Sequence, residues 1–332
     1  MKKIFTFILA VVLLLMPLTA NAKGNVYEVA EKHTFKNSDT VLPYRLLMPD
    51  NYDESKEYPL LVFFHGAGER GDDNELQFFH CVQYIYDNMP EDCIIVVPQC
   101  PIGNQWVDTP WSKGAYTVEK VPESNELHAV IELLNELQDK YSVDSNRIYA
   151  AGISMGGFAV WDVMIRHNNV FAAGIAVCGG GDPTKAQLLK DVPMFVFHGD
   201  ADPDVPVSGS RDTVKAIRNA GGKKIEYTEY AGLGHGIWNT AFATKGLFDK
   251  LLKCKLTDRL PSNEIEVSDK SNAVSESSAD ENESNAENNA KDNAENDKDN
   301  TVLILVLSII LALVLIIGAL LILNRKKPGE TK

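Results

Sequence analysis

The chain has 332 residues, 45% of them hydrophobic, and its 32 basic and 46 acidic side chains give a net charge of −14. A chain with this acidic balance and no stripe of Lys and Arg is not expected to bind nucleic acid. Residues 262–300 hold 12 acidic and 3 basic side chains and no aromatic residue, so this segment carries −9 of the net charge. We call it the acidic stalk, because it has too few apolar side chains to form a hydrophobic core.

The first 22 residues have the pattern of a secretory signal peptide. Lys2 and Lys3 precede an apolar run at 4–18, and Ala20-Asn21-Ala22 resembles a cleavage site. We therefore predict export with cleavage after Ala22. An uncleaved N-terminal anchor is the alternative.

Residues 23–261 have the length and composition of one α/β domain with a full core. Short apolar runs bounded by turn formers predict strands, and apolar residues three and four apart predict helices. In chain order we predict strands at 26–34 and 40–48 that form an antiparallel hairpin at a sheet edge, a strand at 58–65, a helix at 74–88, a strand at 93–98, a helix at 122–141, a strand at 148–151, a helix at 158–165, strands at 172–178 and 194–198, a helix at 208–219, a strand at 224–230 and a helix at 238–252. This alternation predicts a mostly parallel sheet with helices on both faces.

The five cysteines do not form a recognisable disulfide framework. Cys93 and Cys100 lie at the two ends of an apolar strand, about 23 Å apart at roughly 3.3 Å per residue, whereas a disulfide needs Cα atoms within about 7 Å. These two cysteines therefore cannot pair with each other. We interpret most of the cysteines as small buried apolar residues, and one adventitious disulfide remains open.

The segment Gly152-Ile153-Ser154-Met155-Gly156 lies between a predicted strand and a predicted helix. Strand, Gly-x-Ser-x-Gly and helix together form the nucleophile elbow, a tight turn that raises a serine hydroxyl above the sheet. Glycines are needed because the strained turn leaves no room for Cβ atoms beside the serine. The pattern alone arises by chance in roughly one chain in ten of this length, so its catalytic partners must be found as well.

A serine nucleophile needs a histidine base oriented by a carboxylate, and after an elbow the acid precedes the histidine in the chain. After Ser154, His198 and His235 each lie at or just beyond the end of a predicted strand. His235 lies in a glycine loop directly after the last predicted strand, so we predict that it is the base. The acidic loop before it offers three carboxylates among which spacing does not choose: Asp200, Asp202 and Asp204.

The oxyanion formed during acyl transfer needs hydrogen-bond donors that already point at it. One predicted donor is the backbone N–H of Met155, at the start of the helix behind the serine, where the helix dipole also helps. The other is the backbone N–H of Ala67 or Gly68, in the glycine loop after the strand at 58–65.

Tryptophans are the candidates for substrate binding. Trp106, Trp111 and Trp238 could line a pocket for an acyl group or a sugar, and we predict that Trp106 and Trp238 do so, with core packing as the alternative. The sequence shows no metal-ligand cluster. Neither Gly-x-Gly-x-x-Gly nor Gly-Lys-Ser/Thr follows the strand at 58–65, so we expect no metal and no cofactor.

The C-terminal segment has the features of a membrane anchor. Residues 302–323 contain no charge and are long enough to span a bilayer as a helix. Three basic residues follow directly, which predicts a cytoplasmic tail at 325–332. We therefore predict a stalk at 262–300, a transmembrane helix at 301–324 and a catalytic domain outside the cell membrane.

With these residues assembled, the chain resembles the α/β-hydrolase superfamily over residues 40–255. More narrowly, it is similar to secreted esterases related to polyhydroxybutyrate depolymerases, feruloyl and acetyl-xylan esterases and dienelactone hydrolases. The resemblance rests on the stretches 64–71, 98–101, 146–157, 198–202 and 234–235. It implies the α/β-hydrolase fold, and it implies that the catalytic acid is Asp202, the fourth residue after the histidine of His-Gly-x-x-Asp.

The predicted function is the cleavage of carboxylic esters through an acyl-enzyme on Ser154. Only 15 residues separate the predicted strands that end at Cys178 and begin at Met194, which leaves no room for the lid domain of many lipases. An open cleft suits bulky or polymeric esters, such as those of carbohydrates or plant polymers. One alternative is a secreted serine peptidase of prolyl-oligopeptidase-like type, which uses the same triad, and the other is a binding or adhesion protein on a hydrolase fold.

Overall fold

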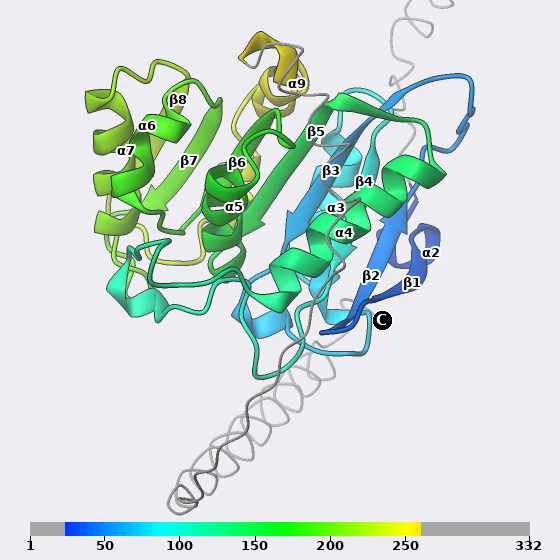
Figure 1. Ribbon diagram of the computed structural model, residues 1–332, viewed down its shortest axis with the longest axis horizontal. Helices are drawn as coiled ribbons and strands as arrows, with labels where there is room; N and C mark the ends of the chain where they lie inside the picture. Colours follow the sequence, from blue (N-terminus) through cyan, green and yellow to red (C-terminus); the bar gives the residue numbers. More distant parts are fainter. Residues whose placement is uncertain (1–23, 260–332) are drawn as a thin grey trace, which may run out of the picture. The chain divides into compact units, whose positions relative to one another are not determined.

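The computed structural model describes residues 24–259, in which helices cover both faces of one twisted sheet (Figure 1). The strands are β1 (Glu31–Lys36), β2 (Val41–Leu47), β3 (Tyr58–Phe64), β4 (Ile94–Pro98), β5 (Val143–Ile153), β6 (Ala173–Val177), β7 (Met194–Gly199) and β8 (Ile225–Tyr230). Their order in the sheet is β1-β2-β4-β3-β5-β6-β7-β8. β2 pairs antiparallel with β1 and β4, and all other neighbours are parallel. This is the predicted α/β-hydrolase fold, with its antiparallel hairpin at the N-terminal edge.

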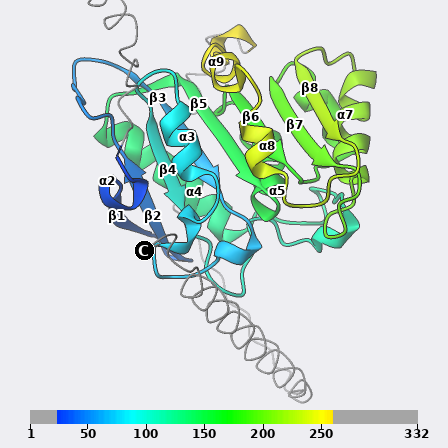
Figure 2. The same cartoon turned by 180° about the vertical axis from the view of Figure 1, so that it is seen from behind.

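Two layers of helices enclose the sheet. One face carries α4 (Asn125–Lys140), α5 (Met155–Arg166), α6 (Ala186–Leu189) and α7 (Ser208–Asn219), which lie in front in Figure 1. The other face carries α2 (Val26–Val29), α3 (Val82–Asn88), α8 (Trp238–Phe242) and α9 (Leu247–Leu252), which are seen in Figure 2. Short 3-10 helices lie at Ala67–Glu69, Leu76–Phe78, Trp111–Lys113, Pro183–Lys185 and Leu256–Asp258.

Strand β3 shows why both faces must be covered. Its side chains alternate between two hydrophobic clusters, with Leu60 and Val62 in the cluster under α4 and α5 and Leu61 and Phe63 in the cluster under α3 and α8. All of them are at most 1% exposed. A strand that is buried on both faces has a continuous run of apolar residues, and this pattern predicted β3.

The first predicted strand is wrong over its first half. Val26–Val29 form helix α2, and the strand begins only at Glu31. The side chain of Asn25 caps this helix by accepting a hydrogen bond from the N–H of Tyr27 at 3.0 Å, and Val26 is fully buried. Capping and burial therefore outweigh the strand preference of the two valines.

Two predicted helices are interrupted. Within 74–88 only the 3-10 turn at Leu76–Phe78 and α3 are helical, and Cys81 lies between them with a left-handed φ of 64°. Within 238–252, Gly246 with a φ of 73° separates α8 from α9. A left-handed residue cannot continue a right-handed helix, and apolar spacing alone does not reveal where such a residue falls.

The carboxyl ends of the parallel strands are open. Within the described residues the connection from β6 to β7 holds only the turn at Pro183–Lys185 and α6, so no large lid covers this edge, as predicted. The loops after β3, β5, β7 and β8 meet there, where ligands bind in open α/β sheets.

Several predicted segments lie outside the described residues, namely the signal peptide at 1–22, the stalk at 262–300, the transmembrane helix at 301–324 and the tail at 325–332. Among residues 24–259, no helix is both long and apolar enough to cross a bilayer. The same residues contain all five cysteines, which form no disulfide bond there, and four of them are buried.

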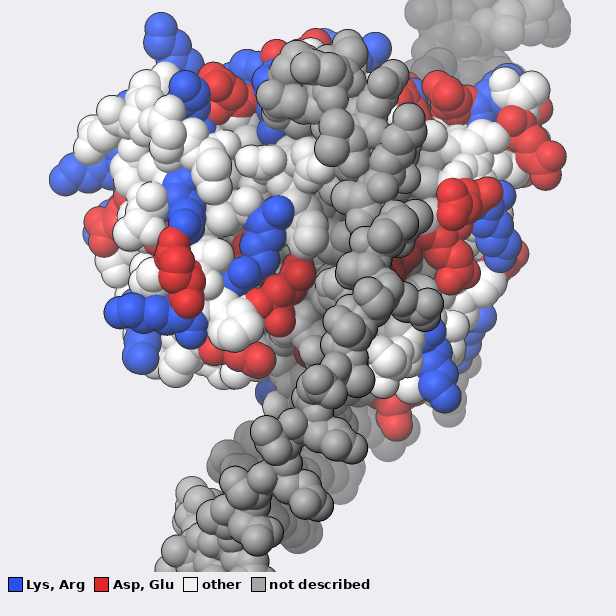
Figure 3. Space-filling model, viewed as in Figure 1, with Lys and Arg blue, Asp and Glu red and all other residues white. Residues whose placement is uncertain are grey.

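Charged side chains are mixed on the face of the molecule seen in Figure 3. Lys and Arg lie among Asp and Glu over the visible surface and do not gather into one basic stripe. Opposite charges in close proximity partly cancel their fields, so this face offers no extended attraction to a polyanion.

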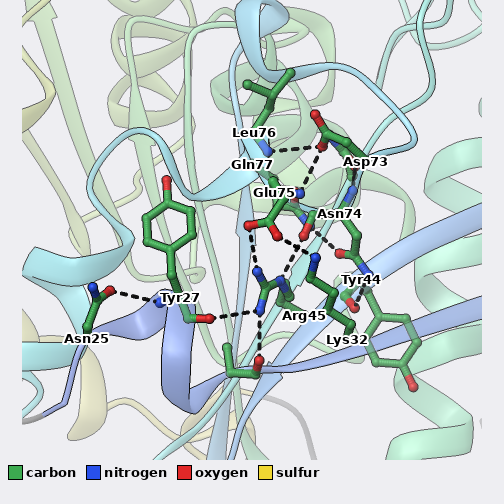
Figure 4. A network of polar contacts seen from close by, with 12 residues as sticks. Asn25, Tyr27, Lys32, Tyr44, Arg45, Asp73, Asn74, Glu75, Leu76 and Gln77 are labelled. Carbon is green, nitrogen blue, oxygen red and sulfur yellow. Dashed lines mark hydrogen bonds and ion pairs between the residues drawn. The ribbon is translucent and has the colours of Figure 1, made fainter.

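A buried arginine ties the N-terminal hairpin to the loop after β3 (Figure 4). The side chain of Arg45, on β2, is 2% exposed. Its guanidinium donates hydrogen bonds to the carbonyl oxygens of Ala30 and Asn74, both at 2.8 Å, and contacts the carboxylate of Glu75 at 2.8 Å. The backbone N–H of Asn74 in turn donates to Gln99 Oε1 at 2.7 Å. This network fixes the segment that follows the glycine loop.

We expect the substitution Arg45→Met to lower the free energy of unfolding by about 3 kcal/mol, because it leaves buried carbonyl oxygens without a donor. Lys32→Met is the matched control, since Lys32 contacts the same Glu75 carboxylate from an exposed position. An exposed ion pair contributes about 0–1 kcal/mol. Urea unfolding of both variants measures the difference, and equal losses would contradict this account.

Candidate active site

The nucleophile elbow is built as the sequence predicts. Strand β5 ends at Ile153 and helix α5 begins at Met155, so Ser154 alone forms the turn. Its φ of 54° and ψ of −120° lie in a region that non-glycine residues rarely occupy, and such strain is typical of functional sites. The Ser154 N–H donates to the carbonyl oxygen of Val177 at 2.8 Å, which fixes the turn to β6.

The two glycines of the elbow are required by close backbone approaches. A Cβ atom on Gly156 would lie 2.0 Å from the carbonyl oxygen of Phe64, and one on Gly152 would lie 2.3 Å from the carbonyl oxygen of Gly156. Backbone atoms cannot give way to such contacts. Any side chain at either position would therefore displace Ser154 from its place above the sheet.

Three predicted residues meet at the end of the sheet. His235 Nε2 lies 2.7 Å from Ser154 Oγ, and His235 Nδ1 lies 2.7 Å from Asp202 Oδ2. A carboxylate oxygen can only accept, so Nδ1 carries the proton when His235 is neutral. Nε2 is then free to accept the proton of the Ser154 hydroxyl. This is the order of donors and acceptors that a nucleophilic serine needs.

The carboxylate of Asp202 is fully buried and has many donors. Its Oδ1 accepts hydrogen bonds from the backbone N–H groups of Asp204 and Val205, both at 2.9 Å. Burial alone would raise the pKa of Asp202, but hydrogen bonds from His198, His235 and the Val205 N–H outweigh it. The pKa of Asp202 therefore lies well below its usual range, and the group stays ionised.

The other two aspartates of the loop occupy different places. Asp200 Oδ1 accepts from the backbone N–H of Gly232 at 2.6 Å, which joins the acidic loop to the glycine loop of His235. Asp204 lines the cleft in front of the serine. Of the three carboxylates that spacing leaves open, only that of Asp202 makes a hydrogen bond to His235 within the described residues.

The predicted oxyanion donors lie beside the serine. Ala67 and Gly68 begin the 3-10 turn after β3 and line the cleft together with Ser154. Met155 is the first residue of α5, so its N–H has no acceptor within the helix and lies at the positive end of the helix dipole. The arrangement can stabilise a negative oxygen next to Ser154.

Of the two tryptophans predicted to bind substrate, the structure places one in the cleft. Trp238 lines the cleft and packs edge to face against His235, with ring centroids 4.9 Å apart. Trp106 is fully buried, and its Nε1 donates to the carbonyl oxygen of His65 at 3.1 Å. Trp106 therefore packs beneath the loop after β3 and does not line the cleft, whereas Trp111 does line it.

Two polar residues of the cleft were not predicted from the sequence. The cleft encloses about 250 Å³, and Glu69 and His80 are among the residues that line it. Glu69 Oε1 lies 3.6 Å from His80 Nε2. Burial raises the pKa of Glu69, which the neighbouring His80 only partly offsets. Glu69 belongs to the same glycine loop as Ala67, and its position in that loop is the signal that could have found it.

Cys178 lies close enough to the triad to raise the question of a metal site. Its Sγ, a carboxylate oxygen of Asp202 and a ring nitrogen of His235 lie within 4.8 Å of one another. Burial raises the pKa of the Cys178 thiol, so it stays protonated and is a poor metal ligand. Asp202 and His235 are already engaged with each other. These groups fit a hydrogen-bonded relay better than a metal centre.

Comparisons with known proteins identify the family and the fold. A model of the phospholipase/carboxylesterase family matches residues 51–248. A solved thermostable esterase is 34% identical over 69% of this chain and 64% of its own, with a TM-score of 0.60. A solved ferulic acid esterase shares the fold, with 19% identity over 67% of this chain and 97% of its own and a TM-score of 0.51.

The curated relatives include both esterases and peptidases. Prolyl endopeptidase FAP of Bos taurus is 23% identical over 69% of this chain and 33% of its own length. The bifunctional acetylxylan esterase/xylanase XynS20E of Neocallimastix patriciarum is 28% identical over 43% of this chain and 19% of its own. The alignments thus span a third or less of these relatives.

Proposed function

This chain belongs to the phospholipase/carboxylesterase family of α/β-hydrolases, and on that premise we propose that it hydrolyses carboxylic esters through an acyl-enzyme on Ser154. The family and the esterase structures of the same fold make it a serine hydrolase of ester bonds. The observation that carries the proposal is the unbroken relay from Ser154 through His235 to Asp202, with both contacts at 2.7 Å.

The proposed mechanism assigns one step to each group. His235 Nε2 takes the hydroxyl proton as Ser154 Oγ attacks the ester carbonyl, and Asp202 stabilises the imidazolium that forms. The N–H groups of Met155 and of Ala67 or Gly68 hold the developing oxyanion. The imidazolium then gives its proton to the departing alcohol, which leaves the acyl group on Ser154. A water molecule activated by His235 releases the acid and restores the serine.

The shape of the cleft supports bulky or polymeric esters as substrates. Within the described residues no large lid covers it, so a long chain can lie across the opening while one ester reaches Ser154. Trp111 and Trp238 offer flat apolar surfaces on which a sugar or an aromatic ring can pack. The relatives that act on acetylxylan and ferulic acid esters support the same class, esters of carbohydrates or plant polymers.

The experiment that tests this function is a panel of p-nitrophenyl esters, feruloyl esters and acetylated xylan on the purified protein. We expect turnover of esters, and no turnover of any ester would overturn the proposal. A serine peptidase is the second candidate, favoured by the similarity to prolyl endopeptidase FAP. An ester and an amide with the same acyl group separate the two, because a peptidase would cleave the amide at a comparable rate. A protein that binds without turning over either would fit the adhesion alternative.

We propose that the enzyme works outside the cell membrane. The support is the signal-peptide pattern at 1–22 and the uncharged run at 302–323 followed by three basic residues. From the composition of its 39 residues alone, the stalk is predicted to reach about 35 Å at roughly 5–6 Å per √n. The catalytic domain would then reach substrate just beyond the membrane.

We expect protease treatment of intact cells to release active enzyme cut within 262–300, because a charged chain without a core is readily cleaved. Deletion of 301–332 should send the activity to the medium. Activity that stays with the cells after this deletion would contradict the anchor, while ester turnover itself would be unaffected.

A further inference from the structure

His198 is a second histidine in direct contact with the catalytic acid. It belongs to β7, four residues before Asp202, and is fully buried. Its Nε2 lies 3.2 Å from Asp202 Oδ2 and 3.1 Å from the carbonyl oxygen of Val205. Its Nδ1 lies 2.8 Å from the hydroxyl of Ser210. Both ring nitrogens therefore have a polar neighbour at hydrogen-bond distance.

The hydroxyl of Ser210 acts as an acceptor toward His198. Ser210 Oγ donates its only proton to the carbonyl oxygen of Gly179 at 2.8 Å. It can then offer only a lone pair to His198 Nδ1, which must carry a proton to make this contact. On the other side, a carbonyl oxygen and a carboxylate oxygen can only accept from Nε2. All neighbours of the ring are thus acceptors, and both nitrogens need a proton.

We propose that His198 is an imidazolium and that it is a positioning residue, which holds Asp202 ionised and in place for His235. With it, each oxygen of Asp202 has two donors: His198 and His235 at Oδ2, and the backbone N–H groups of Asp204 and Val205 at Oδ1. The positive charge offsets the cost of burying the carboxylate, and the carboxylate offsets the cost of burying the cation.

The other charged and titratable groups near His198 and Asp202 are either paired elsewhere or neutral. Glu229 on β8 is the other acid that acts on His198, and its two carboxylate oxygens accept hydrogen bonds from Nε and Nη2 of Arg211, each at 2.6 Å. The buried Cys178 thiol is neutral because burial raises its pKa. His235 Nδ1 contacts the same Asp202 Oδ2 as His198 does. A proton on His235 is therefore stabilised by a carboxylate that His198 already neutralises in part.

This arrangement has a consequence for the pH dependence of catalysis. A bare carboxylate favours the protonated form of a neighbouring histidine and keeps it from acting as a base. The positive charge on His198 opposes that effect. Removing the charge should move the acid limb of the kcat/KM profile to higher pH.

The inference rests on the role proposed for Asp202, but its first test needs no turnover. In the full-length protein labelled with ¹⁵N-histidine and held in detergent at pH 8, we expect two bound ring protons on His198. His198→Gln assigns these signals by their loss, and His128→Gln, at an exposed histidine of α4, is the matched control. A single ring proton on His198 would overturn the proposal, even if the enzyme hydrolyses esters as proposed.

The second test is the pH profile of His198→Gln. A glutamine amide can still donate to Asp202 but carries no charge, so it separates the charge from the hydrogen bond. We expect the acid limb to move up by about one pH unit, as for the loss of a like charge near the protonated His235. His128→Gln should leave it in place. A variant that loses activity at all pH values equally would show a purely structural role for His198 and would contradict the inference.

Discussion

Replacing Ser154 with alanine is expected to reduce kcat for ester hydrolysis by a factor on the order of 10⁶, because no other group can form the acyl-enzyme. His235 would keep its contact with Asp202 and could still activate water, but the covalent intermediate would be lost. Alanine keeps the Cβ atom, so the strained turn is retained. Steady-state kinetics with a p-nitrophenyl ester measures the loss directly.

The control for this prediction separates chemistry from folding. Ser55→Ala removes an exposed serine hydroxyl that donates a hydrogen bond to the carboxylate of Asp53 in its own turn. It should leave kcat unchanged, and both variants should unfold at the same urea concentration as the parent. A Ser154→Ala protein that retains more than about one part in a hundred of kcat would contradict the assignment of the nucleophile.

Replacing Asp202 with asparagine is expected to lower kcat by roughly 10⁴. The amide nitrogen of asparagine donates, so His235 Nδ1 would turn into an acceptor and Nε2 would carry the proton. In that tautomer Nε2 cannot take the proton of Ser154. The geometry would be retained while the base is blocked, and KM for a small ester should change far less than kcat.

Asp204→Asn is the matched control, because its side chain lies in the same loop and lines the cleft but does not contact His235. Its backbone N–H, which donates to Asp202, survives the substitution. We therefore expect a small effect that falls mainly on KM. If Asp204→Asn lowers kcat more than Asp202→Asn, the acid has been assigned to the wrong residue.

The central part of the fold could be predicted from the sequence because its signals are local. Strand β3 and the elbow around Ser154 are specified by neighbouring residues: a doubly buried apolar run in one case and two obligatory glycines in the other. Helix α7 was placed at its observed bounds for the same reason. At Cys81 and Gly246 a single left-handed backbone torsion interrupts the helix, although the spacing of apolar residues continues through both positions.

The candidate site was predictable where the chain order constrains it. The order serine, acid, histidine selected His235, whereas the choice of Asp202 over its neighbours needed the resemblance, because it depends on how the loop folds. Trp106 and Trp111 lie in one long loop, and no local pattern says which of them faces inward. His198 was noticed only as a possible base, since its acceptors Asp202, Val205 and Ser210 are brought to its ring only by the folding of the loop after β7 and the start of α7.

The most direct test of the central claim is to trap the acyl-enzyme or its analogue on the intact protein. A fluorophosphonate reagent reacts with a serine only when an aligned histidine activates it and an oxyanion site receives the charge. We predict one adduct per chain, located by peptide mass spectrometry on Ser154, absent in Ser154→Ala and greatly slowed in Asp202→Asn. An adduct on another residue, or ester turnover by a protein whose Ser154 is never labelled, would contradict the account.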